Sequence, residues 1–138
     1  MVTAFSNGKR GGGWTDDGIC ELPISPKQRL ADVIKTVDNL AFGGTDCALP
    51  MLYAIDEGYA IDTFAVYTDN ETWAGTIHPS QALKKHQRKF DMQSKLVVVG
   101  MTSTNFSIAD PDSPDMLDVV GFDTATPQLI SDFSLNKI

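Results

Sequence analysis

The sequence predicts an α/β domain with a mostly parallel sheet and helices on both faces, because short apolar runs alternate with amphipathic helical segments. Residues 96–101 give the clearest buried strand, a nearly continuous apolar run that suits a strand covered on both faces. A second apolar run, residues 64–67, is also of the kind that suits a strand buried on both faces, and it leads directly into the polar cluster 68–72. Ligands of open α/β sheets bind outside the carboxyl ends of the strands, so we expect the site at this junction.

Composition places the chain among single globular domains. We treat residues 1–138 as one domain, with 42% hydrophobic and 21% charged residues. The net charge of −7 argues against the chain alone gripping nucleic acid by neutralising phosphates. No apolar run reaches the roughly 18 residues that span a bilayer, and no secretory signal is visible. We therefore expect a cytoplasmic location without membrane contact, with Cys20 and Cys47 as free thiols.

The first segment predicts a hairpin with a long tip, formed by strands at residues 2–5 and 19–22. Its tip, residues 7–13, is rich in glycine and reads as a flexible loop. It is no phosphate cradle, because its lysine is not followed by Ser or Thr at a helix start.

The next segment predicts a helix that starts with Ser25 as cap and Pro26 in the first turn, and ends near Asn39. Its apolar positions recur at helical spacing and predict one buried face: Leu30, Val33, Ile34 and Val37.

A second helix follows two glycines. Pro50 is tolerated only in the first turn, which predicts a start near Asp46 or Cys47, and Gly58 ends the helix. Its apolar side is expected at Leu49, Leu52 and Tyr53. Thr45 and Asp46 stand at the mouth of this helix, and capping by itself explains both.

A third helix opens at His78-Pro79, with a buried stripe of Ala82, Leu83, His86 and Phe90. Its other side carries Lys84, Lys85, Arg88 and Lys89; a solvated face is the usual meaning of such a run. His86 is expected to pack rather than bind metal, since no second His or Cys is spaced to join it.

The last segment begins with an acidic loop, residues 107–115, whose spacing is not that of a calcium loop. We expect an extended piece at residues 116–120. A final helix starting at Thr126-Pro127 should turn Leu129, Ile130 and Phe133 inward.

Two stretches carry a family resemblance: Gly43-Gly44-Thr45-Asp46-Cys47, and Tyr-Thr-Asp-Asn-Glu-Thr at residues 67–72. Further matching segments follow in the same order at residues 78–79, 100–103, 108–112 and 121–124. Together they resemble a von Willebrand factor A domain. The likeness is closer still to the carboxy-terminal A domain of the Ro ribonucleoprotein (TROVE) family.

The resemblance implies a metal-ion-dependent adhesion site, in which three loops at the carboxyl edge of the sheet hold a divalent ion, usually Mg²⁺. One loop supplies Asp-x-Ser-x-Ser, the second a Thr and the third an Asp. Thr45 matches the second and Asp69 the third, with Asp46, Asn70 and Glu71 as additional residues at the edge of the site. Hard oxygen ligands of this kind are those that Mg²⁺ prefers.

The sequence departs from the family in having no Asp-x-Ser-x-Ser. The resemblance therefore implies a fold that is incomplete at the N-terminus, without the first strand and helix. That strand belongs between the strands at residues 2–5 and 64–67. Either these two strands pair directly, leaving Val66 and its neighbours exposed, or the slot stays open for another polypeptide. We expect self-association or a partner segment that supplies the strand and helix.

We interpret the chain as a binding module of a Ro-type RNA-binding ribonucleoprotein, not an enzyme. The family's helical-repeat ring would be its partner, and small non-coding RNA would bind indirectly. An alternative is a degenerate A domain that acts only in protein–protein contacts. A metal-dependent hydrolase using Asp69 and Glu71 is a third reading, but no positioned nucleophile and no Gly-x-Ser-x-Gly are visible.

Overall fold

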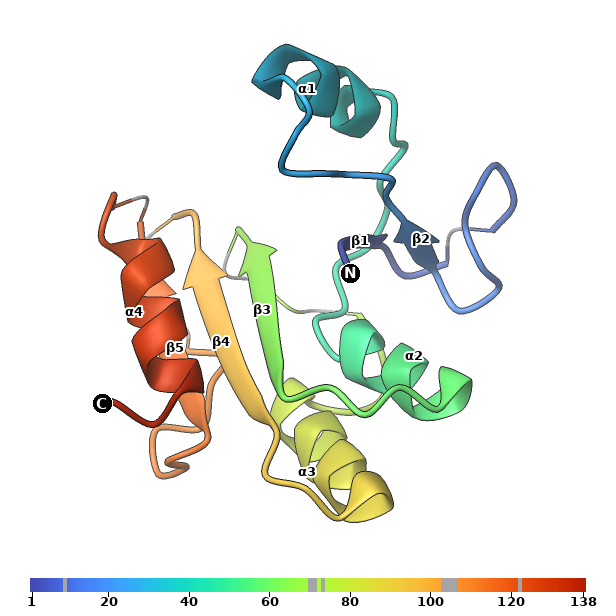
Figure 1. Ribbon diagram of the computed structural model, residues 1–138. Coiled ribbons are helices and arrows are strands. Elements are labelled where there is room, and N and C mark those ends of the chain that lie inside the picture. The colour runs from blue at the N-terminus through green and yellow to red at the C-terminus, as the bar shows by residue number, and fades with distance from the viewer. Residues whose placement is uncertain (9, 70–71, 73, 103–106, 122) are drawn as a thin grey trace.

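The computed structural model describes the whole chain except residues 9, 70–71, 73, 103–106 and 122, and its described part forms two sheets and four helices (Figure 1). The strands are β1 (Thr3–Phe5), β2 (Ile19–Glu21), β3 (Thr63–Thr68), β4 (Lys95–Gly100) and β5 (Met116–Val120). The helices are α1 (Leu30–Asp38), α2 (Leu49–Glu57), α3 (Pro79–Phe90) and α4 (Thr126–Ser134).

The larger sheet is parallel, with β4 between β3 and β5. Thr63 lies opposite Lys95, and Leu96 lies opposite Met116. Every residue of β4 is buried, which confirms the strand expected from the apolar run. The extended piece expected at residues 116–120 is β5.

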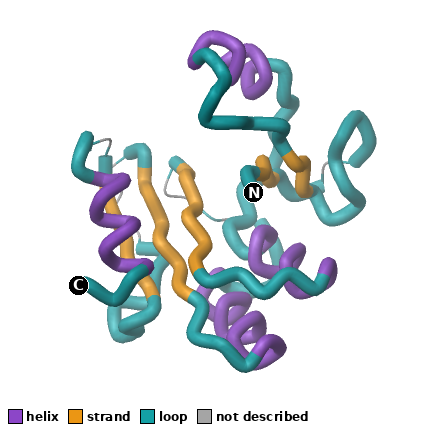
Figure 2. The backbone as a smooth tube through the Cα atoms, in the orientation of Figure 1, coloured by secondary structure: helices purple, strands orange, loops and turns teal. Residues whose placement is uncertain are grey.

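Helices cover both faces of this sheet, as the sequence predicted (Figure 2). On one face α2 and α3 close the main core, in which Met51 and Leu83 pack with Leu96 and Val98. On the other face α4 packs its Phe133 against the alternate β4 side chains. The α/β class is thus confirmed.

One face of β3 departs from the expectation of burial on both sides. Phe64 and Val66 are buried under α2 and α3, whereas Ala65 and Tyr67 are exposed. Burial on both faces was therefore wrong for this strand. Exposure of Val66 was expected only if β1 paired directly with β3, and these two strands lie in separate sheets. Helix α4 packs against β4 and β5, and no described helix covers the second face of β3.

The hairpin formed by β1 and β2 is antiparallel, with Ala4 opposite Cys20, and the long tip is confirmed. It packs beside α2, where the Tyr53 hydroxyl donates to the Glu21 carboxylate at 3.0 Å. Cys20 and Cys47 are both buried, and neither forms a disulfide within the described residues, as expected. Strands β1 and β3 belong to separate sheets, so they do not pair directly.

Helix α1 begins later than Ser25-Pro26 indicated. Ser25 is not the cap of this helix, whose N-cap residue is Arg29. It opens a separate single turn, in which its hydroxyl accepts from the Lys27 N–H at 3.3 Å and its own N–H donates to the Gln28 side chain at 2.9 Å. The Gln28 N–H in turn donates to the Ser25 carbonyl at 3.0 Å. Arg29 is extended, with φ −72° and ψ 143°, so the helix starts only at Leu30.

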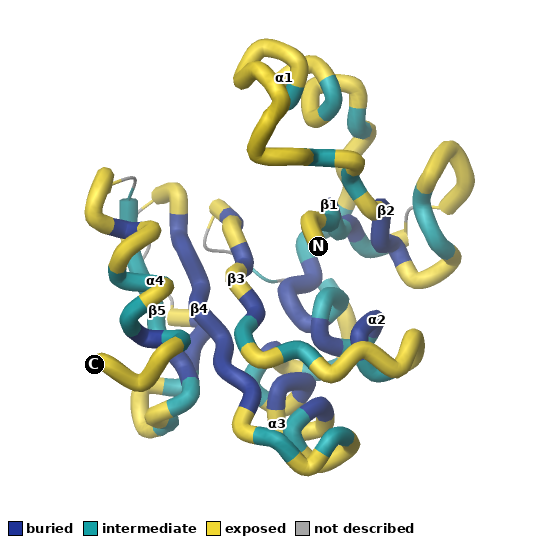
Figure 3. The backbone as a smooth tube through the Cα atoms, viewed as in Figure 1, coloured by how far each residue is buried: buried dark blue, intermediate teal, exposed yellow. Residues whose placement is uncertain are grey.

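The apolar face of α1 exists but is not covered (Figure 3). Leu30 is 74% exposed, Ile34 48% and Val37 36%, and the helix contains no buried residue. An amphipathic helix of this kind normally buries its stripe, so the expected packing partner is lacking among the described residues.

Helix α2 begins at Leu49 rather than Asp46 or Cys47, with Ala48 as the N-cap residue. Its buried residues are Met51, Tyr53 and Ala54, so the inward position of Tyr53 is confirmed. Leu52 is half-buried and packs against the main core, as expected, whereas Leu49 is half-buried and does not belong to that core. Gly58 ends the helix at φ 78°, as predicted.

Helices α3 and α4 match their predictions. Ala82, Leu83 and His86 are buried, and Phe133 faces inward. The His86 ring packs between the Ser94 hydroxyl at 2.8 Å and the Tyr59 carbonyl at 2.9 Å, so it is a core residue. No helix in the described part of the chain is long and apolar enough to cross a membrane.

Candidate functional site

Thr45 and Asp69 both line one groove of about 570 Å³ at the carboxyl edge of the larger sheet. We call this the site groove. It runs between the end of β3 and the hairpin strand β1, and also includes Ser6, Thr68 and Met101. That Thr45 and Asp69 act together in one metal site stays a prediction.

Thr45 is held in place by the end of β1. The Ser6 hydroxyl accepts from the Gly43 N–H at 2.5 Å, and the Asn7 N–H donates to the Gly44 carbonyl at 2.8 Å. Ser6 is 1% exposed. Sequence reasoning missed Ser6, whose only signal was its place directly after a strand.

Asp69 is held by the neighbouring strand ends. The Thr68 hydroxyl donates to the Asp69 carboxylate at 3.2 Å, and the Thr102 hydroxyl donates to the Asp69 carbonyl at 2.7 Å. The Met101 N–H donates to the Thr68 carbonyl at 2.8 Å, which continues the β3–β4 pairing beyond the strands. Asp69 itself is exposed at the groove. Thr102 was not among the predicted site residues.

Asp46 forms a hydrogen bond at the start of α2 and is not among the residues that line the site groove. Its carboxylate is buried and accepts from the Ala48 N–H at 3.0 Å. Burial raises the pKa of this carboxyl above its usual value, and the hydrogen bond from Ala48 opposes that shift in part. A methyl group at Gly75 would lie 2.1 Å from this carboxylate, so only glycine fits there.

The Cys47 thiol is unsuited to nucleophilic work. Burial raises its pKa to about 11, and its Sγ lies 3.9 Å from the Thr68 hydroxyl. Since the thiolate is the reactive form, this cysteine stays inert near neutral pH. Asn70 and Glu71, the other predicted site-edge residues, lie outside the described residues.

The side-chain oxygens of Thr45 and Asp69 are of the type that Mg²⁺ prefers, so the two residues fit a metal site in kind. The set is small. Among the described residues, no three His, Cys, Asp or Glu side chains gather to hold a metal ion. Among its described residues the groove therefore offers one carboxylate, that of Asp69, and hydroxyl groups that carry no charge.

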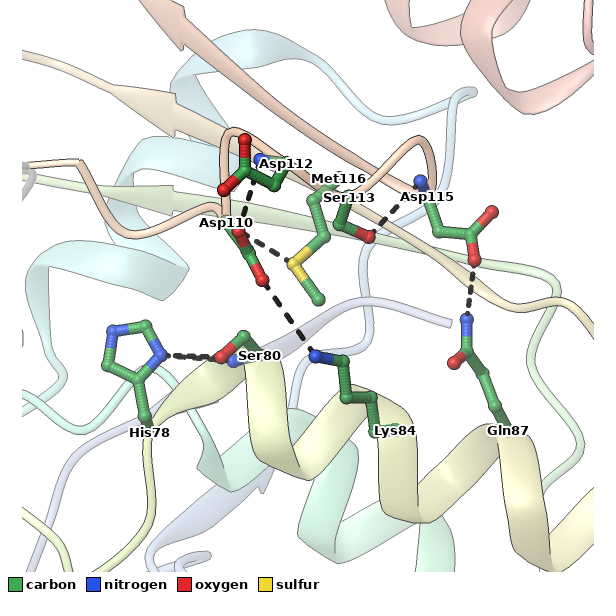
Figure 4. Close-up of polar contacts among 9 residues, drawn as sticks. All are labelled: His78, Ser80, Lys84, Gln87, Asp110, Asp112, Ser113, Asp115 and Met116. Atoms are coloured by element: carbon green, nitrogen blue, oxygen red, sulfur yellow. Dashed lines mark hydrogen bonds and ion pairs between the residues drawn. The ribbon is translucent and has the colours of Figure 1, made fainter.

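Acidic residues before and within β5 make local contacts, and Figure 4 shows those of Asp110 and Asp115. Asp110 accepts from the Asp112 N–H at 3.1 Å and lies 3.8 Å from the Lys84 ammonium. Asp115 accepts from Gln87 at 3.1 Å, and Asp118 accepts from the Ala109 N–H at 3.2 Å. They close the loop rather than form a calcium site.

A second groove, of about 410 Å³, continues along β1 and β3 away from the site. Thr3, Phe5 and Tyr67 line both grooves, so the two form one passage between the strands. We call it the slot. Among the described residues, no strand pairs with the slot-facing edge of β1 or of β3.

A parallel sheet with a Thr loop and an Asp at its carboxyl edge defines the class: a von Willebrand factor A-like domain. A family model described as the Ro60 vWA domain matches residues 2–134. The chain therefore belongs to the Ro60 vWA domain family.

Similar proteins agree with this assignment. The "RNA-binding protein RO60" of Deinococcus radiodurans is 50% identical over 117 residues, which is 85% of this chain and 22% of that protein. The "RNA-binding protein RO60" of Caenorhabditis elegans is 43% identical over 123 residues, 88% of this chain and 19% of that protein. The crystal structure of the D. radiodurans RO (RSR) protein superposes with a TM-score of 0.79 at 48% identity, covering 87% of this chain and 24% of that one. The chain thus spans about a fifth of the length of these relatives.

Proposed function

We propose that this chain is the A-domain module of a Ro-type RNA-binding particle, with a binding rather than a catalytic role. Its family membership and the names of its relatives support this. The partner is a Ro-type helical-repeat ring, and small non-coding RNA is held mainly by that ring. The net charge of −7 agrees with this division, because an acidic chain neutralises few phosphates. A cytoplasmic location stays a prediction.

The slot supplies the observation that carries the proposal. Alternate backbone groups of β3 point away from β4, towards a passage that β1 also borders. Buried without a partner, each such group costs about 1–3 kcal/mol. A strand seated in the slot satisfies both edges, and a following helix covers the apolar face of α1. We propose that this segment carries Asp-x-Ser-x-Ser and comes from the same or another polypeptide. Without it, the exposed apolar surface drives self-association.

The same segment completes the metal site in this proposal. Its Asp and Ser oxygens would join the Thr45 hydroxyl and Asp69 carboxylate, and affinity for hard cations rises with ligand charge. Bound Mg²⁺ would supply an open coordination position for an acidic group of a ligand. Alone, the chain binds Mg²⁺ weakly. A degenerate domain with only protein contacts is favoured by the single described carboxylate at the groove.

The test is calorimetry with Mg²⁺, on the chain alone and with a peptide spanning an Asp-x-Ser-x-Ser strand and its helix. We expect the peptide to bind and to raise Mg²⁺ affinity by at least about tenfold. Asp69→Asn should abolish the gain. Asp62→Asn is the matched control, since Asp62 is exposed at the other end of β3. Peptide binding without any gain in Mg²⁺ affinity would favour the protein-contact reading. Failure of the peptide to bind would overturn the slot proposal.

A further inference from the structure

The exposed side of α3 carries a cationic stripe that the proposed function leaves unused. Gln81, Lys84, Lys85 and Arg88 recur at i, i+3, i+4 and i+7, which is one face of a helix. With Thr76 and Ile77 they line a hollow of about 570 Å³. The buried stripe of α3 faces the core, so this hollow opens away from the sheet.

The cations of this helix differ in how far they are already engaged. Lys84 lies 3.8 Å from the Asp110 carboxylate (Figure 4). The Lys89 ammonium donates to the Ile55 carbonyl. Lys85 and Arg88 are exposed, and neither belongs to an ion pair within the described part of the chain.

Carboxylates do lie near one end of the stripe. Asp91 and Asp115 share a neighbouring hollow with Arg88, outside salt-bridge distance. The Asp115 carboxylate accepts from Gln87 and Gln93, at 3.1 and 2.9 Å. The positive charge of Lys85 and Arg88 therefore remains available to an anion.

We propose that the α3 hollow binds the phosphate backbone of single-stranded RNA directly, chiefly through Lys85 and Arg88. This rests on the proposed function and adds a contact made by this chain itself. At 1.5 Å per residue, the stripe from Gln81 to Arg88 is about 10 Å long, which suits successive phosphates of one strand. Arg presents paired donors to phosphate oxygens.

The chemistry of the lining favours a polyanion over a protein surface. The core of a protein–protein interface is apolar, and among the described residues that line this hollow Ile77 is the one with an apolar side chain. None of these described residues carries an aromatic ring on which a base could stack. Contacts through phosphates alone make the binding independent of sequence and strongly dependent on salt.

The test is the salt dependence of binding to a uridine oligonucleotide, compared between the chain and Lys85→Gln/Arg88→Gln. Each neutralised phosphate contributes about −0.7 to the slope of log affinity against log salt. Loss of two contacts should flatten the slope by about 1.4 and weaken binding roughly 25-fold near 0.1 M salt. Lys27→Gln/Lys35→Gln is the matched control, because it removes equal charge from exposed positions elsewhere.

The control should keep the slope and affinity of the parent chain, and circular dichroism should show that all three proteins are folded. Absence of RNA binding by the parent chain would overturn the proposal. Equal losses of RNA affinity in the two double variants would also overturn it. Displacement of the RNA by polyglutamate at equal charge concentration would overturn it too, and would indicate an acidic protein partner. Peptide binding in the slot stays unchanged in Lys85→Gln/Arg88→Gln, so failure here leaves the slot proposal standing.

Discussion

The α2–α3 core and helix α1 contain similar leucines in opposite surroundings. In the core, Leu83 of α3 is fully buried against the sheet, with Leu96 beside it. On α1, Leu30 stands at an equally regular apolar position and is 74% exposed. We call the α2–α3 core the closed region. We call helix α1, together with the slot edges of β1 and β3, the open region. Periodicity thus predicts that an apolar face exists, but not what covers it.

The largest contrast is expected from one truncation made in both regions. Leu83→Ala leaves a cavity in the closed region and should lower the free energy of unfolding by about 2–5 kcal/mol. Leu30→Ala, also in a helix, should change it by no more than about 0.5 kcal/mol, because little burial is lost. Denaturant unfolding monitored by circular dichroism measures both. Equal losses would mean that the face of α1 is covered in solution.

A smaller contrast separates two glycines with positive φ. Gly75→Ala drives a methyl group into the Asp46 carboxylate and should cost roughly 2–3 kcal/mol. Gly58→Ala, at φ 78° with open space around it, should cost only about 1 kcal/mol. Thermal unfolding of the two variants checks the difference. Indistinguishable melting temperatures would show that Asp46 is not fixed beside Gly75.

The smallest effect concerns pH. Burial raises the pKa of Asp46 above 3.8, so the folded protein holds this proton more tightly than the unfolded chain does. The contribution of protonated Asp46 to the free energy of unfolding is fully present below pH 3.8. It is lost as the pH rises through the raised pKa of the folded state. Asp46→Asn keeps an acceptor for the Ala48 N–H without titrating, so its stability relative to the parent should rise over that interval. Unfolding measured from acid to neutral pH tests this. Asp56→Asn, exposed on the same helix, is the control, and an identical trend in both variants would contradict the assignment.

Local patterns predicted the closed region well. The apolar run of β4, the extended piece at β5 and the inward Phe133 all follow from periodicity. The start of α1 was missed because Ser25 opens a separate single turn instead of capping the helix. The site was only half predictable. The end of a parallel strand indicated Asp69, and only the family resemblance indicated Thr45. Ser6 and Thr102 act on backbone groups 37 and 33 residues away. No local pattern signals such contacts.

The central claim is that the slot of the open region receives a strand, and amide hydrogen exchange tests it most directly. The chain is compared alone and with the Asp-x-Ser-x-Ser strand–helix peptide. We predict that the β1 amides that do not donate to β2, and the β3 amides that do not donate to β4, exchange fast in the chain alone and become protected with the peptide. The amides of β4, paired on both sides, should stay unchanged. If every β3 amide of the chain alone is already as protected as those of β4, and the peptide changes nothing, the slot is closed and the claim is wrong.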